Sequence, residues 1–225
     1  RMMNLQFRAR YTVIFLAGIV LLSVLAYSNT FLGEFQFDDD SSVVENPYVT
    51  DISKFSGLNL AGSAGNGFRP VTAITFALNY QFGRLDVRWY HITNFIIHIF
   101  NGMLIFYLVL LTMRSPKLPV SAHSRSLSVA IISSAIFLLH PIQTEAVSYI
   151  SQRYESLASF FCLCSLIAYI KAVNAERGNS AVFLYGASVL SYILAMGSKE
   201  IAVTIPVIIL LYDFYFLKDR PFLRR

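Results

Sequence analysis

Six long apolar runs limit what this 225-residue chain can fold into more than any other feature. Crossing a bilayer as a helix takes about 20 mainly apolar residues. Charged residues make up only 14% of the chain, against about 25% in soluble domains. We therefore expect an all-α, multi-pass integral membrane protein that forms one domain over residues 1–225. The expected spans lie near residues 11–27, 92–113, 127–139, 154–173, 181–196 and 201–217.

Charged residues are divided unequally between the two ends of these runs. One side carries 12 of the 18 basic residues, and the other side carries the remaining 6 together with 10 of the 13 acidic residues, a net charge of −4. Cytoplasmic loops have an excess of Lys and Arg. The amino terminus is therefore predicted to be cytoplasmic, in a bacterial inner membrane or the endoplasmic reticulum. The net charge of +5 is spread over loop ends, so no nucleic-acid partner is expected.

The largest segment between spans is a predicted outer loop over residues 29–88. Within it, a helix is expected to begin near Pro70, because Pro is favoured in the first turn of a helix. The apolar segment that follows is too short to span, so it is interpreted as an interfacial helix. Tyr80, Trp89 and Tyr90 suit the aromatic belt at headgroup depth.

Three consecutive carboxylates, Asp38, Asp39 and Asp40, follow the first run. They are either a solvated turn or a catalytic or metal-binding cluster at the lipid surface, and Asp40 is read as a solvated cap. Adjacent carboxylates suit a divalent cation, with Glu145 as a further ligand, but nothing in the sequence requires a metal. The two cysteines, Cys162 and Cys164, lie in an apolar run and are interpreted as packing residues.

A polar stripe runs along the second apolar run. His91, Asn94, His98 and Asn101 are spaced by 3, 4 and 3 residues, which places them on one helical face. Polar side chains at membrane depth normally face the bundle interior, either in hydrogen bonds between helices or along a functional pathway. His91 is nearest the outer surface and is the member best placed for a functional role.

Several motifs gather on the predicted outer side. They are Phe37-Asp38-Asp39, Arg69-Pro70-Val71-Thr72, Tyr90-His91-Ile92-Thr93-Asn94, His140-Pro141-Ile142-Gln143-Thr144-Glu145 with Arg153, and Ser198-Lys199-Glu200. With Leu211-Tyr212-Asp213 on the other side, their order resembles the GT-C superfamily of membrane glycosyltransferases. Within it, the likeness is to the amino-terminal part of the transmembrane, tetratricopeptide-repeat-containing O-mannosyltransferases. Members continue with further spans and a repeat domain, so the chain is either a fragment or a short relative.

The resemblance implies transfer of a mannose-like sugar from a polyprenyl-phosphate donor to a hydroxyl acceptor, on a protein or glycan, with inversion. Asp38 or Asp39 would be the general base. Arg69, Arg153 and Lys199 would bind the donor phosphate. Supporting roles fall to the remaining polar residues of the motifs, which are His91, His140, Glu145 and Glu200.

Simpler interpretations stand beside these roles. Arg153 and Glu155 could form a rim ion pair, Lys199 and Glu200 could mark the membrane interface, and His140 could only end a helix. At the level of the whole chain, the alternative is a catalytically inactive accessory subunit packed against other membrane subunits. A transporter is disfavoured, because few charges lie at mid-membrane depth.

Overall fold

The computed structural model describes residues 2–51, 69–175 and 178–217, and within these ranges the regular structure is entirely helical. The predicted all-α class is confirmed. Part of the predicted outer loop and several charges used to predict the orientation lie outside the described residues. Among them are Lys54, Glu176, Arg177 and Lys218.

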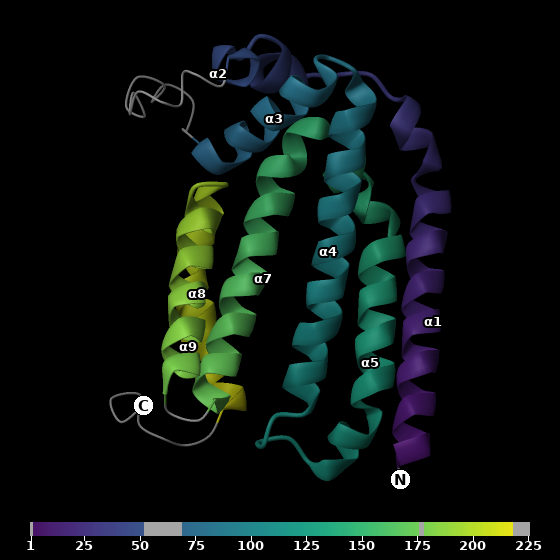
Figure 1. Cartoon of the computed structure of the whole chain (residues 1–225), viewed down its shortest axis with the longest axis vertical. Helices are drawn as coiled ribbons and strands as arrows, with labels where there is room; N and C mark the ends of the chain where they lie inside the picture. The colour runs from purple at the N-terminus through teal and green to yellow at the C-terminus, as the bar shows by residue number, and fades with distance from the viewer. Residues whose placement is uncertain (1, 52–68, 176–177, 218–225) are drawn as a thin grey trace.

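Six helices of the described chain run side by side along the bundle and alternate in direction (Figure 1). They are α1 (Met2–Ala26), α4 (Val87–Met113), α5 (Val120–Leu139), α7 (Arg153–Asn174), α8 (Asn179–Met196) and α9 (Ile205–Phe216). We call the end that holds the α1–α4, α5–α7 and α8–α9 connections the upper end. The opposite, lower end holds the α4–α5 and α7–α8 connections.

Four stretches of the described chain are long and apolar enough to cross a membrane. They are Val87–Met113, Val120–Leu139, Ile150–Asn174 and Asn179–Met196. Large apolar side chains on these helices face outward, for example Val182 and Phe183, which fits a surface covered by lipid. In the first predicted span, the apolar helix Arg10–Ala26 is shorter, and α9 has only 12 residues. Cys162 and Cys164 are free and half-buried on α7.

The third predicted span is longer than expected. It was predicted over residues 127–139, whereas α5 has 20 residues and begins at Val120, directly after Pro119. The added turns are polar, and Ser126 is buried where it accepts a hydrogen bond from Arg114 Nε at 3.3 Å. Hydropathy therefore marked the apolar part of this helix and missed its polar first turns.

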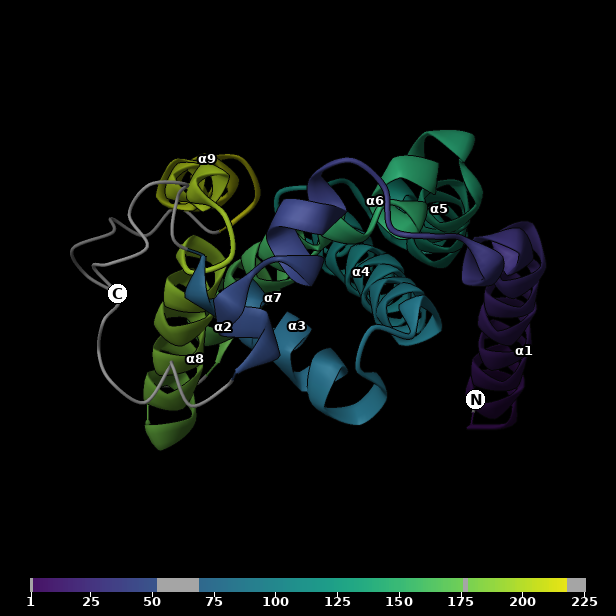
Figure 2. The same cartoon turned by 90° about the horizontal axis from the view of Figure 1, so that it is seen from above.

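Short helical elements cover the upper end. They are α2 (Pro47–Thr50), α3 (Pro70–Gly83), α6 (Thr144–Ser148), a π-helix (Asp40–Val44) and four 3₁₀ helices in the described residues, Ser28–Leu32, Pro141–Gln143, Ile150–Gln152 and Glu200–Thr204. As predicted, a helix begins at Pro70. Seen from above, α2 and α3 lie across the ends of the long helices (Figure 2). Phe76 of α3 is fully buried and packs in one cluster with Val43, Tyr90 and Ile150, so the inner face of α3 rests on protein.

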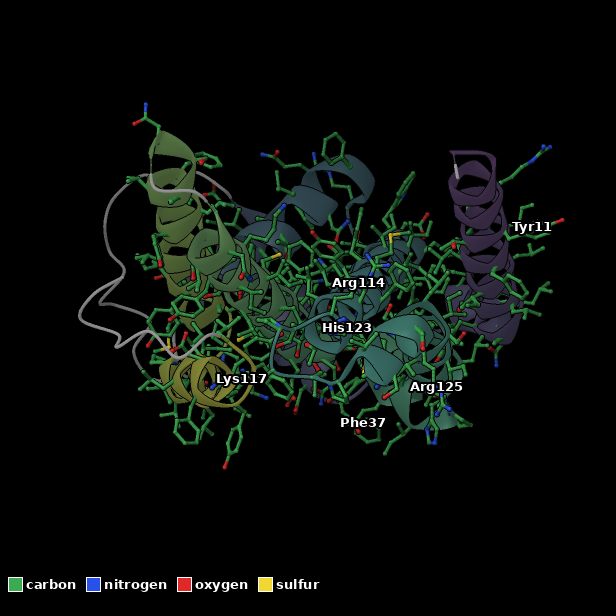
Figure 3. All side chains as sticks on the ribbon, turned by 90° about the horizontal axis from the view of Figure 1, so that it is seen from below. Tyr11, Phe37, Arg114, Lys117, His123 and Arg125 are labelled. Atoms are coloured by element: carbon green, nitrogen blue, oxygen red, sulfur yellow. The ribbon has the colours of Figure 1, made fainter. Side chains whose placement is uncertain are left out.

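The lower end is held together by contacts that α9 makes with the last turn of α4 and with the α4–α5 connection. Lys117 Nζ donates to the carbonyl oxygen of Phe214 at 2.7 Å, and the hydroxyls of Thr112 and Tyr212 are 2.8 Å apart. A cation at the carboxyl end of a helix is favoured by the helix dipole. Figure 3 shows the basic side chains of this connection from below. All of the residues predicted to take part in chemistry belong to segments of the upper end.

Candidate active site

One short segment, residues 149–155, contacts charged residues that lie far apart in the sequence. It runs from the end of α6, through the 3₁₀ helix Ile150–Gln152, into the first turn of α7 at the upper end. The Tyr149 hydroxyl contacts the backbone N–H of Asp38, and the backbone N–H of Ser151 contacts the Asp39 carboxylate. The Tyr154 ring contacts the Arg69 guanidinium, and Glu155 pairs with Lys199. One helical turn rises only about 5 Å. The predicted bases and two of the predicted phosphate ligands therefore all contact this one segment.

The two candidate bases have opposite surroundings. Phe37 before them has a left-handed φ of 51°, so the chain turns sharply here. Asp38 is exposed. Asp39 is buried, and its carboxylate accepts the backbone N–H groups of Gln36 at 3.1 Å and Ser151 at 2.7 Å. Burial raises the pKa of Asp39, and these N–H donors oppose the rise. Asp38 is thus open to a substrate, whereas Asp39 fastens the turn to the start of α7.

Arg153, in the first turn of α7, is fully buried and bonded to two other helices. Its Nε donates to Asn94 Oδ1 at 2.6 Å, its Nη1 to Asn79 Oδ1 at 2.6 Å, and its Nη2 to the Tyr90 carbonyl at 3.0 Å. The guanidinium carbon also lies 4.3 Å from the ring centroid of Phe76. These contacts hold α3, α4 and α7 together. A phosphate could reach this guanidinium only if the side chain left its partners.

Arg69 and Lys199 each form an ion pair at the edge of the upper end. Arg69 donates from Nε and Nη2 to the two carboxylate oxygens of Glu200 at 3.3 and 3.1 Å, and these bonds lower the pKa of Glu200. Lys199 Nζ pairs with Glu155, which therefore does not pair with Arg153. The two cations are 27% and 23% exposed. Exposed ion pairs contribute little stability, so either carboxylate can give way to another anion.

The polar stripe of α4 is buried as predicted, with His91, Asn94, His98 and Asn101 all at most 2% exposed. Asn101 donates to a carbonyl of α7 at 2.9 Å, and Asn94 to a carbonyl of the turn before it at 3.2 Å. A ring nitrogen of His98 lies 3.2 Å from a carbonyl of α5. Three members of the stripe therefore form hydrogen bonds between segments.

His91 is the exception within the stripe. Neither of its ring nitrogens has a hydrogen-bond partner among the described residues. The imidazole lines a pocket of about 210 Å³ at the upper end, together with Glu34, Glu145 and Tyr149. The hydroxyl of Tyr149 also accepts the backbone N–H of Asp38 at 3.0 Å, so the pocket adjoins the exposed candidate base.

His140 and Glu145 are exposed on the connection between α5 and α6. His140 follows the last residue of α5, and its Nδ1 accepts the backbone N–H of Ile142 at 3.2 Å, which fits the simpler interpretation of a helix stop. Glu145 accepts from Gln152 Nε2 at 3.0 Å. Within the described ranges, no three His, Cys, Asp or Glu side chains are grouped to hold a metal ion. Asp38, Asp39 and Glu145 are therefore not grouped as three ligands in the described part of the chain, and a metal there stays a prediction.

Some residues of the site had not been predicted. Asn79 accepts from Arg153, and Thr75 lies 3.4 Å from the same guanidinium nitrogen. Both are polar residues one turn apart on the mainly apolar helix α3, and this spacing was a usable signal. Tyr149 and Glu34 reach the pocket only through the packing of distant segments, so no local pattern marked them.

The chain is similar to several curated proteins named protein O-mannosyl-transferases. It is 32% identical over 202 residues to F38B6.6 of Caenorhabditis elegans, 31% over 201 residues to Tmtc1 of Drosophila melanogaster, and 25% over 201 residues to TMTC4 of Homo sapiens. These alignments cover 85%, 84% and 82% of this chain but 27%, 21% and 27% of the relatives, so the chain spans about a quarter of their length. No family model and no solved structure matches it. The resemblance to O-mannosyltransferases predicted from the motifs is confirmed.

Proposed function

We propose, from this relationship to the protein O-mannosyl-transferases, that the protein is a membrane glycosyltransferase. It moves a mannose-like sugar from a polyprenyl-phosphate donor to a hydroxyl of a protein or glycan acceptor. The described helices form one membrane domain of six crossings, with the amino terminus cytoplasmic and the upper end on the luminal or periplasmic face. The basic α4–α5 connection at the lower end supports this orientation, because cytoplasmic loops are rich in Lys and Arg.

Asp38 is the proposed general base. The acceptor oxygen bonds to the anomeric carbon of the sugar while the bond from that carbon to the phosphate oxygen breaks, and its electron pair leaves with the phosphate. Asp38 takes the acceptor proton, a step that contributes about 10²- to 10⁴-fold to the rate. Attack opposite the phosphate inverts the anomeric centre. Asp39 keeps Asp38 in place, because its carboxylate fastens the turn to Ser151.

Arg69 and Lys199 are the proposed ligands of the donor phosphate. Charge develops on the phosphate as it leaves, and fixed cations stabilise that charge without proton transfer. Arg69 presents a fork that already binds one carboxylate in a bidentate way, and the same geometry suits phosphate oxygens. Glu200 and Glu155 hold the two cations in the free protein. Arg153 is a positioning residue, because it holds α3, the helix that follows Arg69, against α4 and α7.

The observation that carries this proposal is that residues 149–155 contact both the candidate base and the two candidate phosphate ligands. The backbone N–H of the exposed Asp38 and the side chains of two partly exposed cations come from three distant parts of the chain and contact this one segment. The chain that brings them together is similar over most of its length to proteins named for O-mannosyl transfer. The alternative, an inactive accessory subunit, makes no use of an exposed Asp38.

The test uses membranes that contain the protein, a serine- and threonine-containing peptide, and labelled mannose supplied either as polyprenyl-phosphate mannose or as a nucleotide sugar. We expect transfer from the lipid donor with inverted configuration. Asp38→Asn should lower that transfer at least about 100-fold. Asp40→Asn, which removes an exposed carboxylate of the same loop, is the matched control and should stay active.

Two results would overturn the proposed function. If sugar were transferred from the nucleotide sugar and not from the polyprenyl-phosphate sugar, the proposed lipid donor would be wrong. No transfer by the wild-type protein would favour the accessory subunit. Full activity of Asp38→Asn would dismiss only the assigned base.

A further inference from the structure

The pocket beside Asp38 is built from segments that are far apart in the sequence. Its walls come from the stretch after the 3₁₀ helix Ser28–Leu32, from the first turns of α4, and from α6. Its volume of about 210 Å³ lies below the roughly 300–1,000 Å³ of pockets for drug-sized ligands. The pocket therefore suits a ligand about as large as one sugar ring.

The buried imidazole is the strongest sign that the pocket binds something. His91 is 1% exposed, and both of its ring nitrogens lack a protein partner among the described residues. A buried polar group left without a partner costs about 1–3 kcal/mol, and such groups in native proteins need an explanation. Asn94 and His98, further along the same face of α4, both have partners. The stripe has one other unpaired atom among the described residues, Asn101 Oδ1, but the Nδ2 of that amide has a partner. His91 is thus the member of the stripe that lines the pocket and has no polar atom paired.

The chemistry of the walls indicates what the ligand is. Two carboxylates, Glu34 and Glu145, line the pocket, together with hydroxyls such as those of Thr144 and Tyr149, and no described Lys or Arg lines it. Carboxylates without a cation repel a phosphate, so the pocket differs from the edge around Arg69. Carboxylates, hydroxyls and an imidazole can all exchange hydrogen bonds with a neutral molecule that carries several hydroxyls.

We propose that this pocket holds the ring of the transferred sugar, with His91 bonded to one of its hydroxyls. The identity of the sugar rests on the proposed function, whereas the neutral, hydroxyl-rich character of the ligand rests on the pocket alone. Tyr149 connects the pocket with the proposed base, because it lines the pocket and its hydroxyl accepts the backbone N–H of Asp38. The sugar would thus lie beside the base, and its phosphate would extend toward Arg69 and Lys199.

Direct binding is the first test. Purified protein in detergent is titrated with methyl α-mannopyranoside and followed by ligand-observed NMR, with inorganic phosphate as competitor. We expect saturable binding that phosphate does not displace. His91→Phe keeps a ring but loses both nitrogens, and it should weaken binding about threefold to tenfold, as expected for one neutral hydrogen bond. Gly33→Ala should also weaken it, because the new Cβ would lie 3.1 Å from His91 Nε2.

A stability measurement separates binding from packing. Because His91 has no partner in the free protein, His91→Phe should leave the melting temperature unchanged or raise it. His98→Phe is the matched control. It loses a hydrogen bond to the Leu138 carbonyl and should lower the melting temperature without changing the affinity of the folded protein for the glycoside. A fall with His91→Phe as large as that with His98→Phe, at wild-type affinity, would make His91 a packing residue and overturn the proposal.

Kinetics then distinguish the transferred sugar from a sugar already on the acceptor. His91→Phe should raise KM for the lipid-linked donor and leave KM for the acceptor unchanged, whereas the reverse would overturn the assignment. Displacement of the glycoside by phosphate would also overturn it. Failure of this proposal is distinguishable from failure of the proposed function. If the protein binds the glycoside but transfers no sugar, the pocket assignment stands and the proposed enzyme activity fails. If the protein transfers sugar and His91→Phe does not affect the transfer, the enzyme activity stands and the pocket assignment fails.

Discussion

Arg153 and His91 are both buried at the upper end of the bundle, but the regions around them differ in one respect. Arg153 donates hydrogen bonds to Asn79, Asn94 and the carbonyl of Tyr90, whereas His91, the next residue after Tyr90, has no partner among the described residues. Two consecutive residues of α4 thus belong to different surroundings. Tyr90 is part of the hydrogen-bonded cluster around Arg153, and His91 lines the open pocket. Burial alone does not reveal the role of a polar side chain, and its partners do. We expect the cluster around Arg153 to determine the stability of the protein and the pocket at His91 to determine ligand binding.

The largest expected effect on stability comes from removing the Arg153 guanidinium. Arg153→Met would leave the Asn94 amide oxygen and the Tyr90 carbonyl buried without their donor, and the half-buried Asn79 amide oxygen also without its donor, at about 1–3 kcal/mol for each buried group. We expect the free energy of unfolding to fall by at least about 3 kcal/mol, measured by denaturation of the purified protein in detergent. Arg69→Met, which breaks an exposed ion pair, is the control and should change it by at most about 1 kcal/mol. A variant at Arg153 as stable as the control would break the comparison.

Arg69 and Lys199 should show the opposite pattern, because their loss should lower activity and leave stability nearly unchanged. Arg69→Gln and Lys199→Gln each remove a charge from the proposed phosphate site, and a hydrogen bond to a charged group contributes about 1.5–3 kcal/mol. We expect kcat/KM for transfer to fall about 10- to 100-fold with little change in melting temperature. Radiolabel transfer from the lipid-linked donor measures this. Unchanged kcat/KM in both variants would show that the donor phosphate binds elsewhere.

A smaller effect, on the pH dependence of stability, is expected from Asp39. Its carboxylate has hydrogen-bond partners but is shielded from water. Its pKa is raised in the folded protein above the ordinary value of about 3.9. Between the ordinary value and the raised one, the folded state holds the proton more tightly than the unfolded state. Stability should therefore fall as pH rises through this window. Melting temperatures measured across acidic pH should show this slope in the wild type and in Asp38→Asn, and Asp39→Asn should lose it.

Local patterns in the sequence were sufficient to predict much of the fold. The apolar runs gave all six long helices, although hydropathy missed the polar first turns of α5. The stripe from His91 to Asn101 was predictable because helical spacing depends on neighbouring residues alone. For the same reason the start of α3 at Pro70 was predictable, since the fixed φ of Pro acts within its own turn.

The division of roles within the site could not be predicted, because long-range contacts decide it. Adjacent carboxylates Asp38 and Asp39 differ only because the chain turns at Phe37 and Ser151 binds one of them from 112 residues away. In the sequence, Arg153 looks like a residue at the membrane rim. Its burial depends on α3, whose Asn79 meets it only in the folded protein.

The central claim is that Asp38 acts on the substrate and Asp39 acts on the fold, and the most direct test compares Asp38→Asn with Asp39→Asn in one transfer assay. Both variants are purified, their melting temperatures are measured, and mannose transfer from the polyprenyl-phosphate donor is followed for equal amounts of folded protein. The account predicts that Asp38→Asn loses at least about 100-fold in kcat with an unchanged melting temperature, and that Asp39→Asn retains most of its kcat. An active Asp38→Asn together with a stable but inactive Asp39→Asn would contradict it.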